Sequence, residues 1–160
     1  MLTRTLCLTS ALALTASAAQ AKMNFNRIAS FPVVMNMADG EDTSRETSPE
    51  IIDVTEDGMT LVYTDSPLGV LGRIDITDPK SPKPLGNIAL PGEPTSVAVI
   101  GKTAFVGVNT SQSYTEPSGV LKAFDVVSGE EYASCDLGGQ PDSVAKSPDG
   151  SFLAVAIENE

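Results

Sequence analysis

The chain has 160 residues, of which 41% are hydrophobic, and 21 acidic residues outnumber 10 basic ones, for a formal net charge of -11. Nucleic acids and anionic membrane surfaces attract basic proteins, so this charge argues against both as partners. The length is typical of one domain, and the apolar content is sufficient for a buried core.

The first 21 residues have the pattern of a secretory signal peptide. Arg4 supplies a positive start, Leu6 to Ala16 is a short apolar run, and Ala19-Gln20-Ala21 is a small-x-small cleavage site. The apolar run is too short to cross a bilayer as a helix. We therefore predict a secreted protein, periplasmic or extracellular, with residues 1–21 removed and no membrane span.

The segment 22–48 combines a predicted strand with an acidic loop. Phe25 to Phe31 has the same pattern as Leu85 to Leu90, a later predicted strand, so we expect it to be a strand as well. Pro32 to Ser48 shows no hydrophobic period and is expected to be a loop. Its acidic run, Asp39 to Asp42, lacks the alternating ligands of an EF-hand.

Residues 49–160 contain three copies of a hairpin that begins at a proline. The prolines are Pro49, Pro94 and Pro141, so the copies are spaced by 45 and then 47 residues. In the third copy, Asp149-Gly150 separates two apolar runs, and Asp-Gly is a strong hairpin signal because glycine accepts a positive φ. A strand-built repeat of about 40–50 residues predicts a β-propeller or a related array.

Each complete repeat divides into four short strands, which is the content of one propeller blade. The expected strands are 51–54, 61–64, 72–76 and 85–90 in the first copy, 96–99, 104–108, 120–126 and 131–137 in the second, and 143–146 and 152–157 in the third. We therefore predict an all-β fold with two and a half four-stranded blades of an incomplete ring of roughly six to eight. The remaining blades would belong to the same, longer protein, and the strand at Phe25 to Phe31 would complete the last of them.

Cys135 is the only cysteine that follows the predicted signal peptide. In the alignment of the repeats it takes the place of Ile88, which predicts a small, buried, apolar residue. The alternative is a disulfide with a partner outside this stretch.

The repeat geometry predicts a polar rim. The first two strands of each repeat are antiparallel, so the loop before the first strand and the loop after the second lie at the same end of the blade. The polar residues expected there are Glu50, Asp65, Ser66, Glu93, Thr95, Asn109, Ser111, Gln140, Asp142, Glu158, Asn159 and Glu160.

The acidic members of this rim are candidate ligands for a hard cation such as Ca²⁺, which prefers several oxygen ligands. They are Glu50, Asp65, Glu93, Asp142, Glu158 and Glu160. The alternative is that they are solvated loop tips of an acidic protein, with Asp142 capping its own turn. No cofactor other than this cation is indicated.

The sequence assigns no catalytic residue. It contains no histidine, so a Ser-His-Asp triad and a histidine metal site are excluded within these residues. It also lacks a Gly-x-Ser-x-Gly elbow, a P-loop and a dinucleotide-binding fingerprint.

Several stretches carry a resemblance to a known group of proteins. They are Tyr63 to Pro67 (YTDSP), Gly92 to Val99 (GEPTSVAV), Val106 to Ser111 (VGVNTS), Gly138 to Gly150 (GGQPDSVAKSPDG) and Ile157 to Glu160 (IENE). Over roughly residues 25–160, the chain resembles secreted bacterial β-propeller proteins described as phytase-like, esterase-like or alkaline-phosphatase-like. Its hairpins also resemble YVTN and LVIVD repeats.

The resemblance implies that the full-length protein is a metal-assisted phosphoric ester hydrolase acting on a small phosphorylated substrate, with metal-activated water as the nucleophile. No catalytic motif of that group matches this chain residue by residue, so the chain alone is expected to be inactive. The alternative is a non-catalytic propeller that serves as a binding module at the cell surface.

Overall fold

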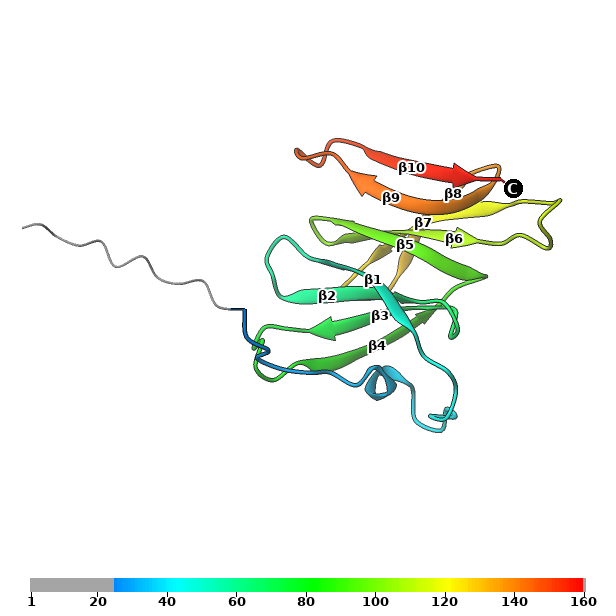
Figure 1. The fold of residues 1–160 in the computed structure, drawn as a ribbon. Helices are drawn as coiled ribbons and strands as arrows, with labels where there is room; N and C mark the ends of the chain where they lie inside the picture. Colours follow the sequence, from blue (N-terminus) through cyan, green and yellow to red (C-terminus); the bar gives the residue numbers. More distant parts are fainter. Residues whose placement is uncertain (1–24, 160) are drawn as a thin grey trace, which may run out of the picture.

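A computed structural model describes residues 25–159, so the predicted signal peptide and Glu160 lie outside the described residues. Within this range there are ten strands and one short 3-10 helix (Figure 1). The elements are η1 (Val33–Asn36), β1 (Pro49–Val54), β2 (Thr60–Asp65), β3 (Val70–Asp75), β4 (Lys83–Ala89), β5 (Glu93–Ile100), β6 (Thr103–Asn109), β7 (Gly119–Asp125), β8 (Glu131–Asp136), β9 (Gln140–Lys146) and β10 (Leu153–Glu158).

The strands form three antiparallel sheets in chain order. Two are four-stranded, with the orders β1-β2-β3-β4 and β5-β6-β7-β8, and the third is the hairpin β9-β10. Figure 1 shows them stacked one after another without closing into a ring. Every predicted strand of the three repeats is present, with ends that differ from the prediction by no more than three residues. The prediction of successive propeller blades is therefore confirmed.

The inner strand of each sheet carries a bulge at the same place. The register shifts just after Pro49 in β1, after Pro94 in β5 and after Pro141 in β9. The shift leaves Thr95 in β5 and Asp142 in β9 without a residue opposite in the ladder. Proline cannot donate a hydrogen bond to a strand ladder and is accepted at bulges, so the bulge recurs in each sheet because the proline recurs.

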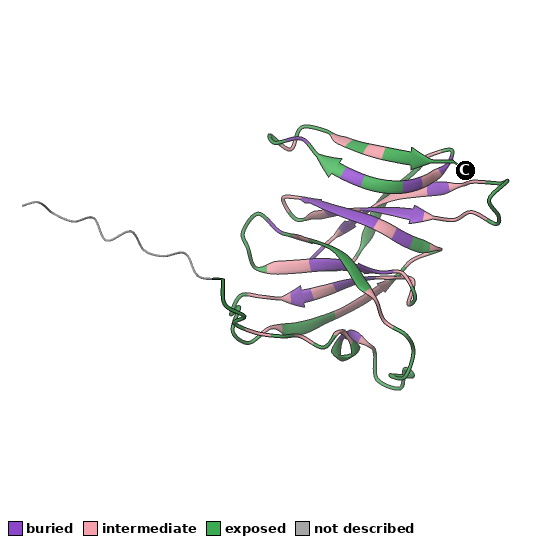
Figure 2. Ribbon diagram, in the orientation of Figure 1, coloured by how far each residue is buried: buried purple, intermediate pink, exposed green. Residues whose placement is uncertain are grey.

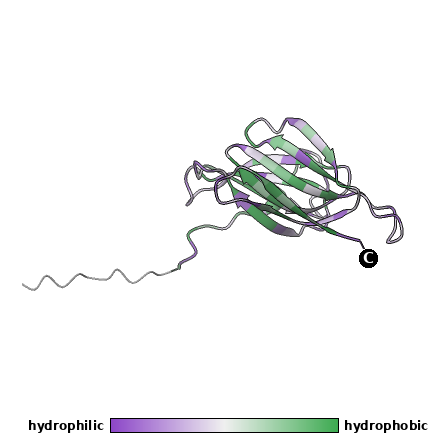
Figure 3. Cartoon of the chain, turned by 90° about the horizontal axis from the view of Figure 1, so that it is seen from above, coloured by the Kyte–Doolittle hydropathy of each residue, from purple (hydrophilic) through white to green (hydrophobic). Residues whose placement is uncertain are grey.

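The hydrophobic core lies between the first and second sheets. Its buried members are Val62, Leu71, Val97, Val99, Ala104, Val106, Val108, Phe124 and Val126. The second sheet is covered on both faces, because β5 contacts β1 and β2 on one side and β9 on the other. Buried residues are accordingly concentrated in this middle sheet (Figure 2), and the hydrophobic residues follow the strands rather than the loops (Figure 3).

Two of the hairpin turns are built in the same way. The Ser147 hydroxyl donates to the Asp149 carboxylate at 2.7 Å and accepts a bond from the backbone N–H five residues later at 3.2 Å. Thr55 and Asp57 make the same pair of contacts in the first repeat. Hydrogen bonds from the Ser147 and Ser151 hydroxyls and from the Ser151 N–H lower the pKa of Asp149 to about 2. Gly150 then turns the chain at a φ of 67°, as the Asp-Gly signal predicts.

A polar clasp joins the inner strands of all three sheets. The Oδ2 atom of Asp53 in β1 accepts hydrogen bonds from the Lys146 ammonium in β9 at 2.9 Å and from the Val99 N–H in β5 at 2.8 Å. The same ammonium donates to the Val99 carbonyl at 2.8 Å. Partial burial acts to raise the pKa of Asp53, but the hydrogen bonds from Lys146 and Val99 outweigh it and hold the pKa below 3.8.

Acid should weaken this clasp. Because the folded-state pKa of Asp53 lies below the unfolded value, its contribution is complete above about pH 4 and is lost as the pH falls through the folded pKa. Replacing Asp53 with asparagine should lower the free energy of unfolding by about 1 kcal/mol at neutral pH, and the loss should shrink as the pH is lowered from about 4. Urea denaturation at several pH values measures both, with Lys146→Met as the partner variant. A loss that stays constant with pH would contradict the prediction.

The N-terminal segment differs from its prediction. Residues 25–32 form no strand, and Phe25 and Ile28 are 95% and 61% exposed. A strand needs the backbone of a neighbouring strand, and no described strand pairs with this segment. The sequence pattern of this segment is therefore insufficient to make it a strand. Its role in closing a ring stays a prediction.

What holds the N-terminal segment is the short helix η1, which contacts β3 and β4. Asn36, at the end of η1, is buried and donates from its Nδ2 to the Tyr63 hydroxyl at 2.9 Å. Its Oδ1 accepts the Gly86 N–H at 3.1 Å. Burial raises the pKa of Tyr63, which keeps the phenol neutral and available as a hydrogen-bonding partner.

The burial predicted for Cys135 is wrong, although its register is right. Cys135 pairs with Leu121 as Ile88 pairs with Leu71, so the two residues occupy equivalent positions. However, all six residues of β8 are exposed, and Cys135 is a free thiol. Burial of an outer strand depends on what packs over it, which the alignment of repeats does not encode.

Candidate functional site

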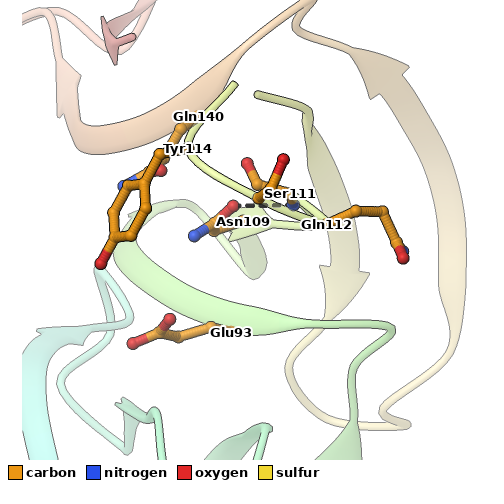
Figure 4. Close-up of a pocket in the computed structure, with 7 residues that line it drawn as sticks. Glu93, Asn109, Ser111, Gln112, Tyr114 and Gln140 are labelled. Carbon is orange, nitrogen blue, oxygen red and sulfur yellow. Dashed lines mark hydrogen bonds between the residues drawn. The ribbon is translucent and has the colours of Figure 1, made fainter. Parts of the chain in front are cut away.

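A pocket of about 260 Å³ lies at the predicted rim, where the second and third sheets meet (Figure 4). It is lined by Glu93, Asn109, Ser111, Gln112, Ser113, Tyr114 and Gln140. Glu93 begins β5, Asn109 ends β6 and Gln140 begins β9, whereas the others belong to the loop 110–118 between β6 and β7. The pocket thus collects loop ends from two neighbouring blades.

The β6–β7 loop is closed at its base by hydroxyl groups. Ser111 Oγ accepts the Ser118 N–H at 2.9 Å and donates to the Ser118 carbonyl at 3.1 Å. The Thr110 N–H donates to the same carbonyl at 3.0 Å, and the Thr110 and Ser118 hydroxyls lie 2.9 Å apart. Near the tip, Ser113 and Glu116 form an isolated β-bridge. These contacts order the loop before any ligand arrives.

Three groups of different chemistry face the same space. Figure 4 shows the amide of Asn109, the carboxylate of Glu93 and the ring of Tyr114 turned toward one region, whereas the side chain of Gln112 extends away from it. Asn109 Oδ1 accepts the Ser111 N–H at 2.9 Å, which directs its NH₂ group to the other side. The Glu93 carboxylate accepts no hydrogen bond from any residue that the structure describes. This site can donate and accept hydrogen bonds beside an aromatic face.

Four residues of the predicted rim are brought together in this pocket. They are Glu93, Asn109, Ser111 and Gln140. Thr95 lies at the bulge, with its hydroxyl 3.4 Å from the Gly107 carbonyl. Asp142 and Glu158 are exposed and do not line the pocket, and the side chain of Asn159 accepts the Gln140 N–H at 3.2 Å.

The rim residues of the first repeat form a separate, structural group. Asp65 is fully buried, and its Oδ1 accepts the Ser48 N–H at 3.1 Å and the Leu68 N–H at 3.3 Å, so it caps the turn after β2. Ser66 Oγ lies 2.9 Å from the Pro94 carbonyl and 3.3 Å from the Glu50 carboxylate. These contacts connect the first blade to the start of the second.

The five predicted metal ligands that the structure describes are not gathered at one point. Over residues 25–159, no group of three or more His, Cys, Asp or Glu side chains is placed so that it could hold a metal ion. Of these five, only Glu93 lines the pocket, and Asp65 is occupied by backbone N–H groups. The sixth predicted ligand, Glu160, lies outside the described residues.

Sequence reasoning missed the tip of the β6–β7 loop, which contributes Gln112, Ser113 and Tyr114. One signal was available. The corresponding loop of the first repeat is only 66–69, so the second repeat contains extra residues at 110–118. An insertion at a rim, with an exposed aromatic residue in it, is typical of a binding loop.

Solved structures with similar folds include hydrazine synthase from Kuenenia stuttgartiensis, with a TM-score of 0.58 and 23% identity over 70% of this chain and 30% of that one. A functionally unknown protein from Desulfotomaculum acetoxidans matches with a TM-score of 0.51 and 17% identity, over 68% and 36%. A eukaryotic initiation factor matches with a TM-score of 0.52 and 13% identity, over 75% and 28%. At these identities the likeness shows the fold alone, and the chain spans about a third of their length.

No curated protein matches the chain. The described residues also contain no helix of the length and hydrophobicity that a membrane span requires. The comparisons support a bacterial β-propeller-like domain, and they do not specifically support the phytase-like, esterase-like and alkaline-phosphatase-like group or the YVTN and LVIVD repeats. The family described as the choice-of-anchor I domain matches residues 34–160, which include all three sheets. The chain therefore belongs to the choice-of-anchor I domain family.

Proposed function

We propose that this chain is a non-catalytic binding module of a surface-anchored or secreted bacterial protein, and that the rim pocket is its binding site. The family name and the signal-peptide pattern at residues 1–21 both support a place at or beyond the cell surface. The observation that carries the proposal is the composition of the pocket. It combines one carboxylate with amides, hydroxyls and a single aromatic ring.

These groups suit binding better than hydrolysis. Hydrolysis of an ester or a glycoside by acidic residues uses paired carboxyl groups or several metal ligands at one point, and this pocket brings only Glu93. The lining contains no lysine or arginine, so a phosphorylated substrate would meet a negative charge without a positive one. The phosphoesterase hypothesis thus has less support here than the binding module.

Two measurements on the full chain test the proposal. A fluorescently labelled chain should bind isolated bacterial envelopes saturably, and the double variant Glu93→Ala/Gln140→Ala should bind more weakly. The matched control is Glu130→Ala/Asn26→Ala, which changes two exposed residues outside the pocket.

The second measurement is turnover of an aryl phosphate with calcium and with a chelator, where we expect none. Calcium-dependent turnover would show that the module is catalytic. Equal envelope binding by the pocket variant and its control would show that the binding site lies elsewhere, and failure to bind envelopes at all would contradict surface attachment.

A further inference from the structure

We propose that the rim pocket binds a neutral carbohydrate, with one pyranose ring packed against Tyr114. This inference rests on the proposed function, because it names the ligand of the same pocket. It is carried by three properties of the described residues: an exposed aromatic ring on an ordered loop, convergent uncharged polar groups, and the charge of the surroundings.

Tyr114 is presented to solvent at the tip of the β6–β7 loop. The residue is 82% exposed and does not belong to the hydrophobic core. The hydroxyl contacts at Thr110, Ser111 and Ser118 hold the base of the loop, so little further ordering is needed when a ligand packs on the ring. An exposed tyrosine on an ordered loop offers a flat apolar face with a polar end, and the C–H face of a pyranose complements that combination.

The other lining groups match sugar hydroxyls, each of which both donates and accepts hydrogen bonds. Asn109 presents the NH₂ group as a donor, because its Oδ1 is used by Ser111. Glu93 presents only acceptors, whereas Gln140 supplies both kinds of group. The pocket thus offers donors and acceptors around the space that the Tyr114 ring borders (Figure 4).

Charge and size narrow the ligand class. The lining lacks basic residues and the chain carries a net charge of -11, which disfavours phosphates, sulfates and uronic acids. The lining is polar apart from one ring, which disfavours lipids. A volume of about 260 Å³ is below the range of roughly 300–1,000 Å³ typical of pockets for drug-sized ligands, so the site accommodates a unit near the size of one sugar ring.

Isothermal titration of the full chain with neutral oligosaccharides of glucose, mannose, galactose and N-acetylglucosamine tests the inference. We expect at least one of them to bind. Tyr114→Ala should weaken that binding about tenfold or more, and Tyr114→Phe should retain most of it, because the ring face provides the contact. Tyr132→Ala is the matched control, since Tyr132 is an exposed tyrosine on β8, outside the pocket. Thermal melting checks that each variant is folded.

Four outcomes would overturn the inference. The first is envelope binding that persists while none of the sugars binds; the proposed function would then stand and only the ligand class would be wrong. The second is sugar binding that Tyr114→Ala leaves unchanged. The third is preferential binding of a diamine such as putrescine that disappears in Glu93→Gln, which would assign the pocket to a cation instead. The fourth is that the chain binds neither the sugars nor the envelopes, which would remove the inference and the proposed function together.

Discussion

Replacing Gly72 with alanine should expel the Tyr63 ring from the first blade and lower the free energy of unfolding by about 3–5 kcal/mol, the range for removal of a buried aromatic side chain. The two residues are paired across β2 and β3, and a methyl group at Gly72 would overlap carbon atoms of the ring. Tyr63 is 2% exposed, and its hydroxyl accepts a hydrogen bond from Asn36. A ring displaced by the methyl group would therefore lose both its burial and this hydrogen bond. Urea denaturation measures the loss.

A double-mutant cycle separates this steric cause from a general effect of alanine in β3. In a Tyr63→Ala background, the Gly72→Ala change should lower the stability by much less, because the clashing ring is already absent. Tyr63→Phe is the matched control for the ring alone; it keeps the packing and loses the hydrogen bond from Asn36 and the longer one, 3.5 Å, to the Asn87 Oδ1, with an expected loss of about 1 kcal/mol. Additive losses in the cycle would refute the explanation.

Replacing Gly119 with alanine should separate the second and third blades. A methyl group there would overlap the Pro141 ring and lie 2.5 Å from the Gly139 carbonyl oxygen. Neither a proline ring nor a backbone carbonyl can rotate away as a flexible side chain does, so β9 must move from β7. We expect a loss of about 2–3 kcal/mol in the free energy of unfolding. Because Gly119 follows the β6–β7 loop and Pro141 follows Gln140, ligand binding at the rim pocket should fall as well.

Gly107 provides the graded comparison for this prediction. It faces the same proline, but a methyl group on it would lie 3.2 Å from the Pro141 Cβ. A shift of a few tenths of an ångström relieves that contact, so Gly107→Ala should cost about 1 kcal/mol or less. If Gly107→Ala were as damaging as Gly119→Ala, loss of glycine from a strand, and not the approach of Pro141, would be the cause.

The parts of the fold that the sequence predicted are those with local signals. The prolines 49, 94 and 141 fix where each hairpin begins, and a turn glycine, preceded by Asp in the first and third copies, fixes where it bends. Antiparallel pairing then follows from chain direction. The same reasoning placed Glu93, Asn109 and Gln140 at one end of their blades, where the structure brings them together. Strand direction and repeat spacing were sufficient to place these three residues because neighbouring blades repeat the same geometry.

The errors concern features that depend on contacts between distant residues. Cys135 has the register of Ile88 but not its burial, since burial requires a neighbouring surface. Phe25 to Phe31 has a strand-like pattern without a described partner strand. Tyr114 was overlooked because the position of the loop depends on hydroxyl contacts such as that between Ser111 and Ser118, which have no periodic pattern.

The bulges that follow the prolines place residues near the rim pocket that can be substituted without disturbing strand pairing. Thr95 and Asp142 each stand outside the strand-to-strand ladder, two residues after Glu93 and Gln140, which line the pocket. A side chain at such a position can be exchanged for another of similar size without displacing the pairing of the strand that carries it. The second and third blades therefore each offer one exchangeable position near the pocket, beside a framework of paired strands, so single substitutions at Thr95 or Asp142 should change the ligand preference one blade at a time.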